Sequence, residues 1–497
     1  ERDFTVVPED EKTLSREAKY ALEQLQESVK WNEERGKYSA GLPYKFGREK
    51  TAEILRSVDS KATAERRAWS LKRSMEKVPE KKEKGFAEMR KFVEKGRARE
   101  LSREEEKEQD RNKGPIWHLP CHLVFQHGKY RFCHDGRAAT KGVCLNDLLI
   151  GDLNLMVPIA DPINNLRSYI YSFSTDIESF FHNILVDERD EGLFRFHWYE
   201  SEKMERLVMY VFLAHIFGSS ASPTITSYVL RKHSTLLRGI FSDKVCDIIE
   251  KYFYVDDGSG GDNSVEGCKK LCDELEEAMK LGGFTLSKWK FSHPELKGER
   301  TVEKEGEAEK KILGVVWNTA TDRLSVAIDD EKFEEKAETP RHVVQQQAAL
   351  FAPIGMIAPF ILLGRRWTQS SMIDDWGWDL KLLKEVEEGF NAWTASIHLL
   401  RKISIPRAWD IPETVGGKEQ LHIFADACMT GYGSVAYRRV LGKGGAINVA
   451  FINGRSHVTP KNASRAGHHG SIPRLELSAT VKATEVLKAI QHSVQGR

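Results

Sequence analysis

The spacing of hydrophobic and polar positions changes several times along the chain, and each change predicts a different kind of element. From residue 1 to 113 charged residues dominate. Between Thr63 and Arg111, Glu is mixed with Lys and Arg at helical spacings, which predicts mostly helices with solvated faces. The alternative for this segment is a face that tracks phosphates. From residue 116 to 147 short alternating runs, such as 129–133, predict strands.

Short β runs alternate with helical stretches from residue 165 to 325. Several of their connections are too short for parallel crossovers, so we expect an α+β arrangement with antiparallel strands. The clearest β runs are 169–175, 207–214, 252–255 and 312–317, and the clearest helix is 265–281.

The remaining third of the chain changes its pattern once more. Residues 326–410 are rich in helical patterns punctuated by prolines. Three β runs follow, at 421–426, 432–437 and 446–451, and then a helix from about 472 to 490. This order of elements predicts a further α/β domain at the C-terminal end.

Composition narrows the class of protein without naming a partner. The chain has 497 residues, 40% of them hydrophobic, so about three packed domains are expected. Lys plus Arg number 75 and Asp plus Glu 74, so any surface for a polyanion must be local. The seven cysteines include no CxxC pair, which predicts reduced thiols inside a cell, in the cytoplasm. No apolar run approaches the roughly 18 residues of a membrane span, so no membrane partner is expected.

The first residues show no signal-peptide pattern and do not begin with Met. We therefore expect a piece cut from a larger polyprotein or an expressed fragment.

Two adjacent aspartates, Asp256 and Asp257, lie between an apolar β run and a glycine-rich exit at 258–261. Like charges this close repel unless a cation lies between them, so the pair predicts a metal site at a strand turn. The alternative is a solvated Asp-Asp-Gly hairpin turn, which is common in proteins.

A third acid strengthens the metal interpretation. Asp176 ends the apolar run at 169–175, before what the pattern predicts to be an amphipathic helix. Two hard divalent cations about 3.5–4 Å apart need bridging carboxylates, which Asp176 supplies if the strands are neighbours. The alternative is that Asp176 caps the helix after it. Glu178 is left out of the metal set because it should face elsewhere.

These residues, in order, resemble the motifs of reverse transcriptases, and specifically those of Bel/Pao-type LTR retrotransposon polyproteins. The resemblance runs from about residue 15 to 495. It rests on Asp176 with an aromatic residue five positions later, on the motif FGSSASP at 217–223 and on YVDD at 254–257. Further stretches of the same likeness are WHLP at 117–120, GVCLND at 142–147, GGFTLSKW at 282–289, ILGVVWN at 312–318, FAPIGMIAP at 351–359 and IPRLEL at 472–477.

The resemblance implies a right-hand polymerase fold of fingers, palm and thumb, followed by a connection and a partial ribonuclease-H-like α/β domain. The implied divisions are a charged helical extension with fingers at 1–113, fingers and palm at 114–325, thumb and connection at 326–415, and the ribonuclease-H-like domain at 416–497. The implied enzyme is an RNA-directed DNA polymerase that extends a primer on an RNA or DNA template with dNTPs. Other products of the same polyprotein are further expected partners.

The resemblance also implies roles for individual residues. Asp176, Asp256 and Asp257 would hold two Mg²⁺ ions, with Mn²⁺ as a substitute. Phe181 would exclude a 2′-hydroxyl beneath the incoming sugar, although a core aromatic is the alternative. Arg131 would bind the triphosphate, and Gly218 would lie near the new base pair. Phe217 stands where many retroviral enzymes have Gln. Lys288 would donate a proton to pyrophosphate, a role for which Lys290 is the alternative.

The C-terminal pattern resembles the start of a ribonuclease H. Asp426 would end its first strand, and Glu476 would face Asp426 from the first helix. Such nucleases use about four carboxylates, and residues 470–497 contain only two acids, Glu476 and Glu485. We therefore expect an incomplete site and little ribonuclease H activity. Two rival functions stay open, a non-catalytic nucleic-acid-binding scaffold that keeps the polymerase fold and a primer-independent RNA polymerase.

Overall fold

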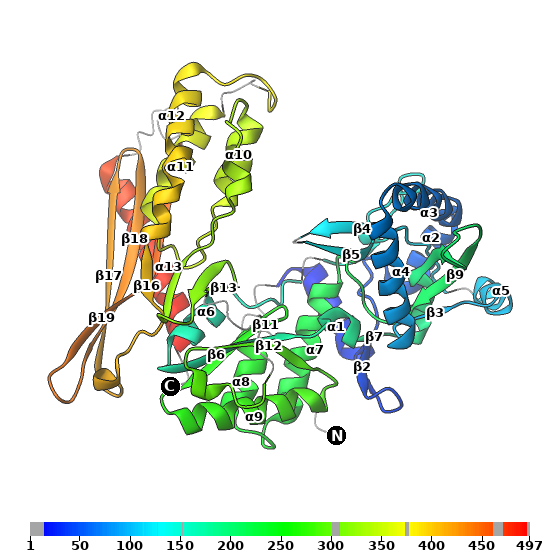
Figure 1. Cartoon of the computed structure of the whole chain (residues 1–497), viewed down its shortest axis with the longest axis horizontal. Helices are drawn as coiled ribbons and strands as arrows, with labels where there is room; N and C mark the ends of the chain where they lie inside the picture. The colour runs from blue at the N-terminus through cyan, green and yellow to red at the C-terminus, as the bar shows by residue number, and fades with distance from the viewer. Residues whose placement is uncertain are drawn as a thin grey trace. The chain divides into compact units, whose positions relative to one another are not determined.

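The computed structural model describes residues 14–112, 114–126, 128–151, 153–300, 309–372, 377–460 and 471–494. The chain divides into two compact units, each assembled from separate segments (Figure 1). Unit 1 comprises Glu1–Met156, Ile177–Glu250 and Leu275–Thr285. Unit 2 comprises Val157–Asp176, Lys251–Glu274 and Leu286–Arg497. The predicted divisions at residues 113, 325 and 415 stay predictions.

Unit 1 combines helices with small sheets. Its helices are α1 (Arg16–Ser28), α2 (Gly47–Arg56), α3 (Ser60–Lys77), α4 (Pro79–Glu94), α5 (Arg103–Arg111), α7 (Ser222–Leu237) and most of α8 (Asp243–Lys251). One sheet has the order β1 (Lys30–Asn32), β2 (Lys37–Ala40), β7 (Leu185–Val186). A second has the order β3 (Ala98–Glu100), β9 (Leu207–Phe212), β8 (Arg195–Tyr199), and β4 (Cys121–Gln126) pairs with β5 (Lys129–His134).

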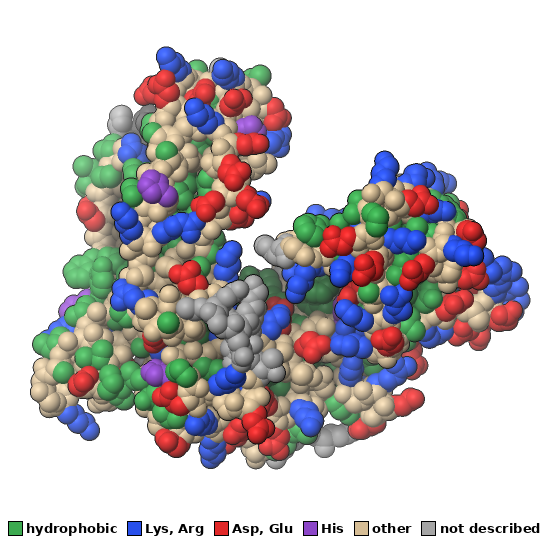
Figure 2. Space-filling model, in the orientation of Figure 1, with side chains coloured by type: hydrophobic (Ala, Val, Ile, Leu, Met, Phe, Trp, Pro, Cys, Tyr) green, Lys and Arg blue, Asp and Glu red, His purple; other side chains and the backbone are tan. Residues whose placement is uncertain are grey.

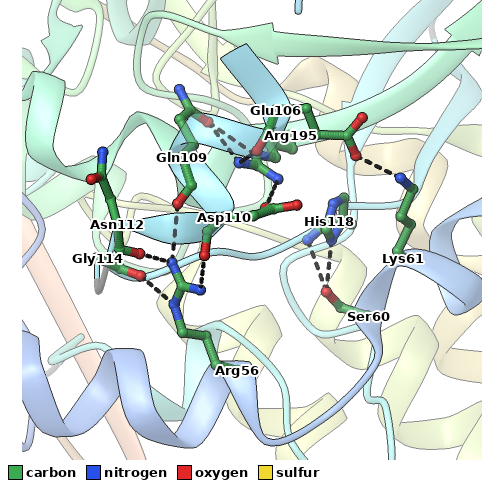
Figure 3. Close-up of polar contacts among 10 residues, drawn as sticks. All are labelled: Arg56, Ser60, Lys61, Glu106, Gln109, Asp110, Asn112, Gly114, His118 and Arg195. Carbon is green, nitrogen blue, oxygen red and sulfur yellow. Dashed lines mark hydrogen bonds and ion pairs between the residues drawn. The ribbon is translucent and has the colours of Figure 1, made fainter. Parts of the chain in front are cut away.

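Helix α5 shows how a segment without apolar residues is held in place. It begins with a capping box between Ser102 and Glu105, and none of its side chains is buried. Polar contacts attach it instead (Figure 3). The fully buried guanidinium of Arg195 donates to Asp110 Oδ1 at 2.8 Å, and Arg56 donates to backbone carbonyls around the helix end, including that of Asp110 at 2.9 Å.

The described residues of unit 2 form three sheets. The first has the order β10 (Phe253–Tyr254), β11 (Asp257–Asp262), β6 (Tyr171–Ile177), β12 (Leu286–Phe291). The second joins β13 (Glu309–Ile312), β14 (Val315–Asn318), β15 (Arg323–Val326) and β16 (Ser404–Pro406). The third is the antiparallel sheet of β17 (Lys418–Cys428), β18 (Gly431–Leu441) and β19 (Ile447–Val458).

Helices cover these sheets. Helix α6 (Ala160–Arg167) contacts β11, α13 (Ile472–Val494) contacts β17 and β18, and α11 (Ala358–Ser371) contacts β19. The helical core of the predicted 326–410 region is built by α10 (Pro340–Ala349), α11 and α12 (Lys384–Ala395), around buried residues such as Phe390 and Trp393. Helix α9 (Val265–Leu281) has the predicted bounds and contributes to both units.

Two sequence predictions are wrong in detail. The run at 312–317 is two strands, because Leu313 and Gly314 adopt positive φ angles of 49° and 86° and turn the chain between β13 and β14. No amphipathic helix follows Asp176. Ser179 has a φ of 54°, a left-handed conformation, and only a short 3-10 turn, Phe180–Asn183, comes after it. Asp176 therefore caps no helix there.

The surface mixes charges of both signs. Figure 2 shows Lys and Arg side chains interspersed with Asp and Glu, in keeping with the formal charge of +1. Among the described helices, none combines the length and the apolar character needed to cross a membrane.

Candidate active site

Strands β6 and β11 bring two of the predicted acids together within unit 2. They pair antiparallel, and the register places Asp176 directly opposite Asp257, while Tyr171 lies opposite Asp262 at the other end. Directly opposed residues have Cβ atoms about 4.5–5.5 Å apart, so both side chains leave the sheet on the same face. The two strands are therefore neighbours, which was the condition for Asp176 to belong to the same site as Asp257.

The third acid lies in the turn before β11. Tyr254 on β10 pairs with Asp257, so Val255 and Asp256 form a two-residue hairpin turn. Val255 has a φ of 57°, a conformation that is unfavourable for a β-branched side chain. Such strain typically costs about 1–3 kcal/mol and collects at functional sites. The turn therefore holds Asp256 at a costly but defined position beside Asp257.

Neighbouring residues fix the strand that carries Asp257. Gly258 leaves room for the ring of Phe253, which a Cβ would approach to 2.4 Å. Ser259 is held from both sides by α6, since Asn165 Nδ2 donates to its carbonyl at 2.8 Å and its hydroxyl donates to the Pro162 carbonyl at 2.6 Å.

The electrostatics of Asp257 are those of a crowded, desolvated carboxylate. Burial, and next the charge of Asp256, raise the pKa of Asp257 to about 6, with a further contribution from Asp176. Lys290 and Lys288 oppose this rise. Negative charge at this position is therefore incompletely compensated by the protein, which is the condition that favours a bound cation.

Lys288 supplies part of the compensation. Its Nζ lies 2.8 Å from Asp176 Oδ2, and its φ of 52° is unusual for a residue within a strand such as β12. Within the described part of the chain, no three His, Cys, Asp or Glu side chains are grouped closely enough to hold a metal ion. The donors have the chemistry that Mg²⁺ prefers, and the ammonium of Lys288 occupies an oxygen of Asp176 that a bound cation would use.

The other predicted lysine has a different environment. Lys290 is buried, and its Nζ donates to the Lys311 carbonyl at 3.4 Å. Glu178, left out of the metal set, forms an ion pair with Lys95 at 3.0 Å.

The predicted sugar-facing aromatic, Phe181, lies in unit 1. It is 8% exposed, and its ring packs edge-on against Phe217 with centroids 4.7 Å apart. Phe217 is 45% exposed and presents the accessible side of this pair. Phe181 is therefore a buried residue of the hydrophobic core. Its contact with a nucleotide stays a prediction.

Gly218 is required by a contact inside unit 1. Its φ is 112°, and a Cβ would lie 1.9 Å from the carbonyl oxygen of His134. Asn146 clamps the same turn, since its Nδ2 donates to the Gly218 carbonyl at 2.9 Å and its Oδ1 accepts from the Ser220 amide at 3.0 Å. The sequence motif at 142–147 contains Asn146, but nothing in the pattern points to this contact.

Two further positions in unit 1 belong to the sequence motifs or to the implied nucleotide contacts. Helix α7 begins at Ser222 with Pro223 in its first turn, where proline is favoured. Arg131 is exposed on β5, opposite Val124 of β4, so its guanidinium is accessible to a ligand.

The ribonuclease-H-like pair is not brought together. Leu421 and Ile423 of β17 pack with Val486 and Ile490 of α13, so α13 covers the face on which odd-numbered β17 residues lie. Side chains alternate along a strand, which places Asp426 on the opposite face. The expectation that Glu476 on α13 faces Asp426 is therefore wrong.

Comparison with known proteins gives one family match. Residues 339–496 match the family described as "Pao retrotransposon-like RNaseH-like domain". The C-terminal part of the chain is Pao retrotransposon-like. This Pao-like region contains α10–α13 and all of β16–β19, and it confirms the resemblance for residues 339–496, which include the motifs at 351–359 and 472–477. A search of curated proteins finds no match.

Solved structures with a similar fold include those of a foamy viral protease–reverse transcriptase. The form called dRH in complex with double-stranded DNA has a TM-score of 0.50 at 16% identity, over 81% of this chain and 59% of that one. The complex with RNA/DNA hybrid gives 0.50 and 16%, over 83% and 47%. The complex with double-stranded DNA gives 0.51 and 15%, over 83% and 72%.

This likeness shows the fold of the chain, a mixed helix-and-strand arrangement like that of retroviral reverse transcriptases with a ribonuclease-H-like C-terminal domain. The chain spans about half to three fifths of the length of the first two of these structures.

Proposed function

We propose that this chain is the reverse transcriptase core of a retroelement polyprotein, a DNA polymerase that extends a primer on an RNA or DNA template. The observation that carries the proposal is the register that sets Asp176 opposite Asp257, with Asp256 in the adjoining turn. In this proposal β6, β10, β11 and β12 are the palm sheet, unit 1 carries the fingers, and α10–α12 belong to the thumb and connection.

The proposed chemistry is nucleotidyl transfer, in which the primer 3′-oxygen bonds to the α-phosphorus of a dNTP and pyrophosphate leaves. Asp176, Asp256 and Asp257 would hold two Mg²⁺ ions, which when bound lower the pKa of the 3′-hydroxyl and neutralise the triphosphate. The carboxylates fix where the charge of the substrate is compensated. Lys288, once displaced from Asp176, would act as the proton donor to the leaving pyrophosphate, and Arg131 would bind the triphosphate.

The test is primer extension by the purified chain on RNA and DNA templates, with dNTPs or rNTPs. Mg²⁺-dependent extension with dNTPs on both templates is the expected result. Extension with rNTPs and no primer would support the RNA polymerase alternative instead.

A second candidate function is that of a scaffold that binds nucleic acid without catalysis. The Lys288–Asp176 ion pair favours it, because the lysine neutralises Asp176 without a metal. Both candidates predict binding that weakens steeply with salt, since several counterions are released from the nucleic acid. Binding with no extension in Mg²⁺ or Mn²⁺ would select the scaffold, and salt-independent binding would contradict both.

Substituting Lys288 with Met should separate these roles. Because the 2.8 Å ion pair competes with cations for Asp176, the K288M chain should bind Mn²⁺ several-fold more tightly. If Lys288 also donates the proton to pyrophosphate, the maximal extension rate should fall about 10²-fold or more. Mn²⁺ titration and single-turnover extension measure the two effects. An unchanged Mn²⁺ affinity would show that the ion pair does not control the site.

Replacing Phe181 with Ala should weaken discrimination against ribonucleotides by about tenfold or more, since the ring packs against Phe217, which is exposed to solvent. It should also lower stability by about 3–5 kcal/mol, as removal of a buried ring does. The matched control is Phe180→Ala, because Phe180 is also buried and its ring stacks on that of Phe181. Equal dNTP/rNTP ratios in the two variants would assign Phe181 to the core alone.

A further inference from the structure

Arg407 lies in the Pao-like region and is fully buried within unit 2. Its guanidinium forms a two-point ion pair with Asp322, at 2.8 Å to Oδ1 and 2.7 Å to Oδ2. Its remaining donors reach the carbonyls of Leu166, Tyr169 and Ile170 and the hydroxyl of Ser172. All the N–H groups of a planar fork are thereby used, which no lysine reproduces.

These acceptors occupy one joint of the fold. Leu166 lies in the last turn of α6, Tyr169 and Ile170 form the connection, and Ser172 lies at the start of β6. Arg407 therefore binds the connection between α6 and β6, the strand that carries Asp176. Its own amide donates to the Asp322 carbonyl at 2.9 Å, which fixes the arginine in turn.

A second buried arginine, Arg167, extends the joint to the sheet of β17, β18 and β19. Arg167 donates to the carbonyls of Phe451 at 2.7 Å, Ile452 at 3.3 Å and Arg407 at 3.1 Å, and it lies over the ring of Trp409. Burial, and next the charge of Arg407, lower the pKa of Arg167 to about 9. The joint thus connects α6 to β19 through one buried network.

The same joint reaches both strands of the acid ladder. Arg407 holds the start of β6, and α6 holds β11 through Asn165 and Ser259. The far end of this ladder is the pair Asp176 and Asp257. Any rotation or slip of β6 at the joint is transmitted along six paired residues to the carboxylates.

We propose that Arg407 is a positioning residue for the carboxylate site, so that the Pao-like region supplies the anchor of the strand that carries Asp176. The rate measurements that test this proposal rest on the proposed polymerase function. The cation-binding measurement requires only that Asp176, Asp256 and Asp257 bind a cation. Arg407 touches no substrate. It acts through the backbone of residues 166–172, and a displacement of about 1 Å at a reacting centre lowers rates about 10²-fold.

The experiment compares Arg407→Met with Arg438→Met. Arg438 is the matched control because it is also buried and pairs with two carboxylates, Asp410 at 2.7 Å and Glu419 at 2.8 Å, and the ion pairs that hold it involve neither β6 nor α6. Each variant is assayed for maximal extension rate, KM for dNTP, Mn²⁺ affinity and thermal midpoint.

The expected result for R407M is a maximal rate lowered about 10²-fold with KM changed less than about threefold, and Mn²⁺ binding weakened about tenfold. R438M should lose comparable thermal stability and keep both the rate and the Mn²⁺ affinity. Equal losses in both variants, or an unaffected R407M chain, would overturn the proposal.

Two arrangements keep the test decisive. If R407M does not fold, Arg407→Lys takes its place with the same expected results, because a lysine keeps the positive charge beside Asp322 but cannot make all the contacts of the guanidinium with residues 166–172. If the unsubstituted chain shows no extension, the polymerase assignment fails, and the Mn²⁺ affinities of R407M and R438M still decide the role of Arg407.

Discussion

Substitution of Asp256 with Asn is expected to abolish primer extension, with a loss of about 10³-fold or more. Asn keeps the shape of the side chain but removes the charge that would hold a divalent cation, which is worth several kcal/mol in the transition state. The turn itself should persist, because Val255 and the Tyr254–Asp257 pair define its backbone. Single-turnover extension across a range of Mg²⁺ concentrations measures the loss.

The matched control for this variant is Asp262→Asn. Asp262 lies on the same strand, at the other end of the ladder opposite Tyr171, and its Oδ1 accepts from the Ser264 amide at 3.0 Å, a bond that Asn retains. It should extend primers at the normal rate. Full activity of the Asp256 variant, or activity in excess chelator, would contradict the metal site.

Substitution of Asp257 with Asn is expected to abolish extension and, at the same time, to make the metal-free protein more stable above pH 6. The folded pKa of Asp257 is about 6, against an ordinary value of 3.8, so the folded state binds more protons than the unfolded state between these pH values. Asp257 therefore lowers the free energy of unfolding progressively as pH rises from about 4 to 6. The shift corresponds to roughly 1–3 kcal/mol.

Denaturant unfolding of both proteins between pH 4 and 8, in chelator, measures this effect. The two curves should meet near pH 4 and separate as pH rises, with the Asn variant more stable. Addition of Mg²⁺ should stabilise only the unsubstituted protein, by mass action on the folded state. A variant that is less stable at every pH would show that Asp257 makes favourable contacts that outweigh its desolvation.

Local pattern was sufficient to predict elements whose causes lie nearby in sequence. Helix α9 has the predicted bounds, and the acidic turn between β10 and β11 follows from an apolar run, two aspartates and a glycine-rich exit. The helix expected after Asp176 failed because Ser179 takes a left-handed conformation, which no periodicity reveals. The prediction that Glu476 faces Asp426 failed for another reason. Side chains alternate between the two faces of a strand, but the sequence pattern does not show which face α13 covers.

Contacts between distant residues were beyond the reach of the sequence pattern. The ion pair between Lys288 and Asp176 joins residues 112 apart, and Asn146 clamps a turn 72 residues away. Each depends on the register of strands or on the path of a loop, which single-sequence periodicity does not encode. The motifs predict the three acids of the proposed site, and only the fold shows that Lys288 pairs with Asp176.

The contact between Arg407 and Tyr169 also bears on the order in which the protein acquires structure during synthesis. The two residues are 238 positions apart, so the strand with Asp176 emerges from the ribosome long before its anchor. Contacts of such separation form late, because closing a long loop precedes the gain from the contact. The amino-terminal helices can fold early, while the acid ladder reaches its final geometry only after residue 407 has been translated. While residues 177–406 are being translated, the strand that carries Asp176 therefore lacks its contacts with Arg407.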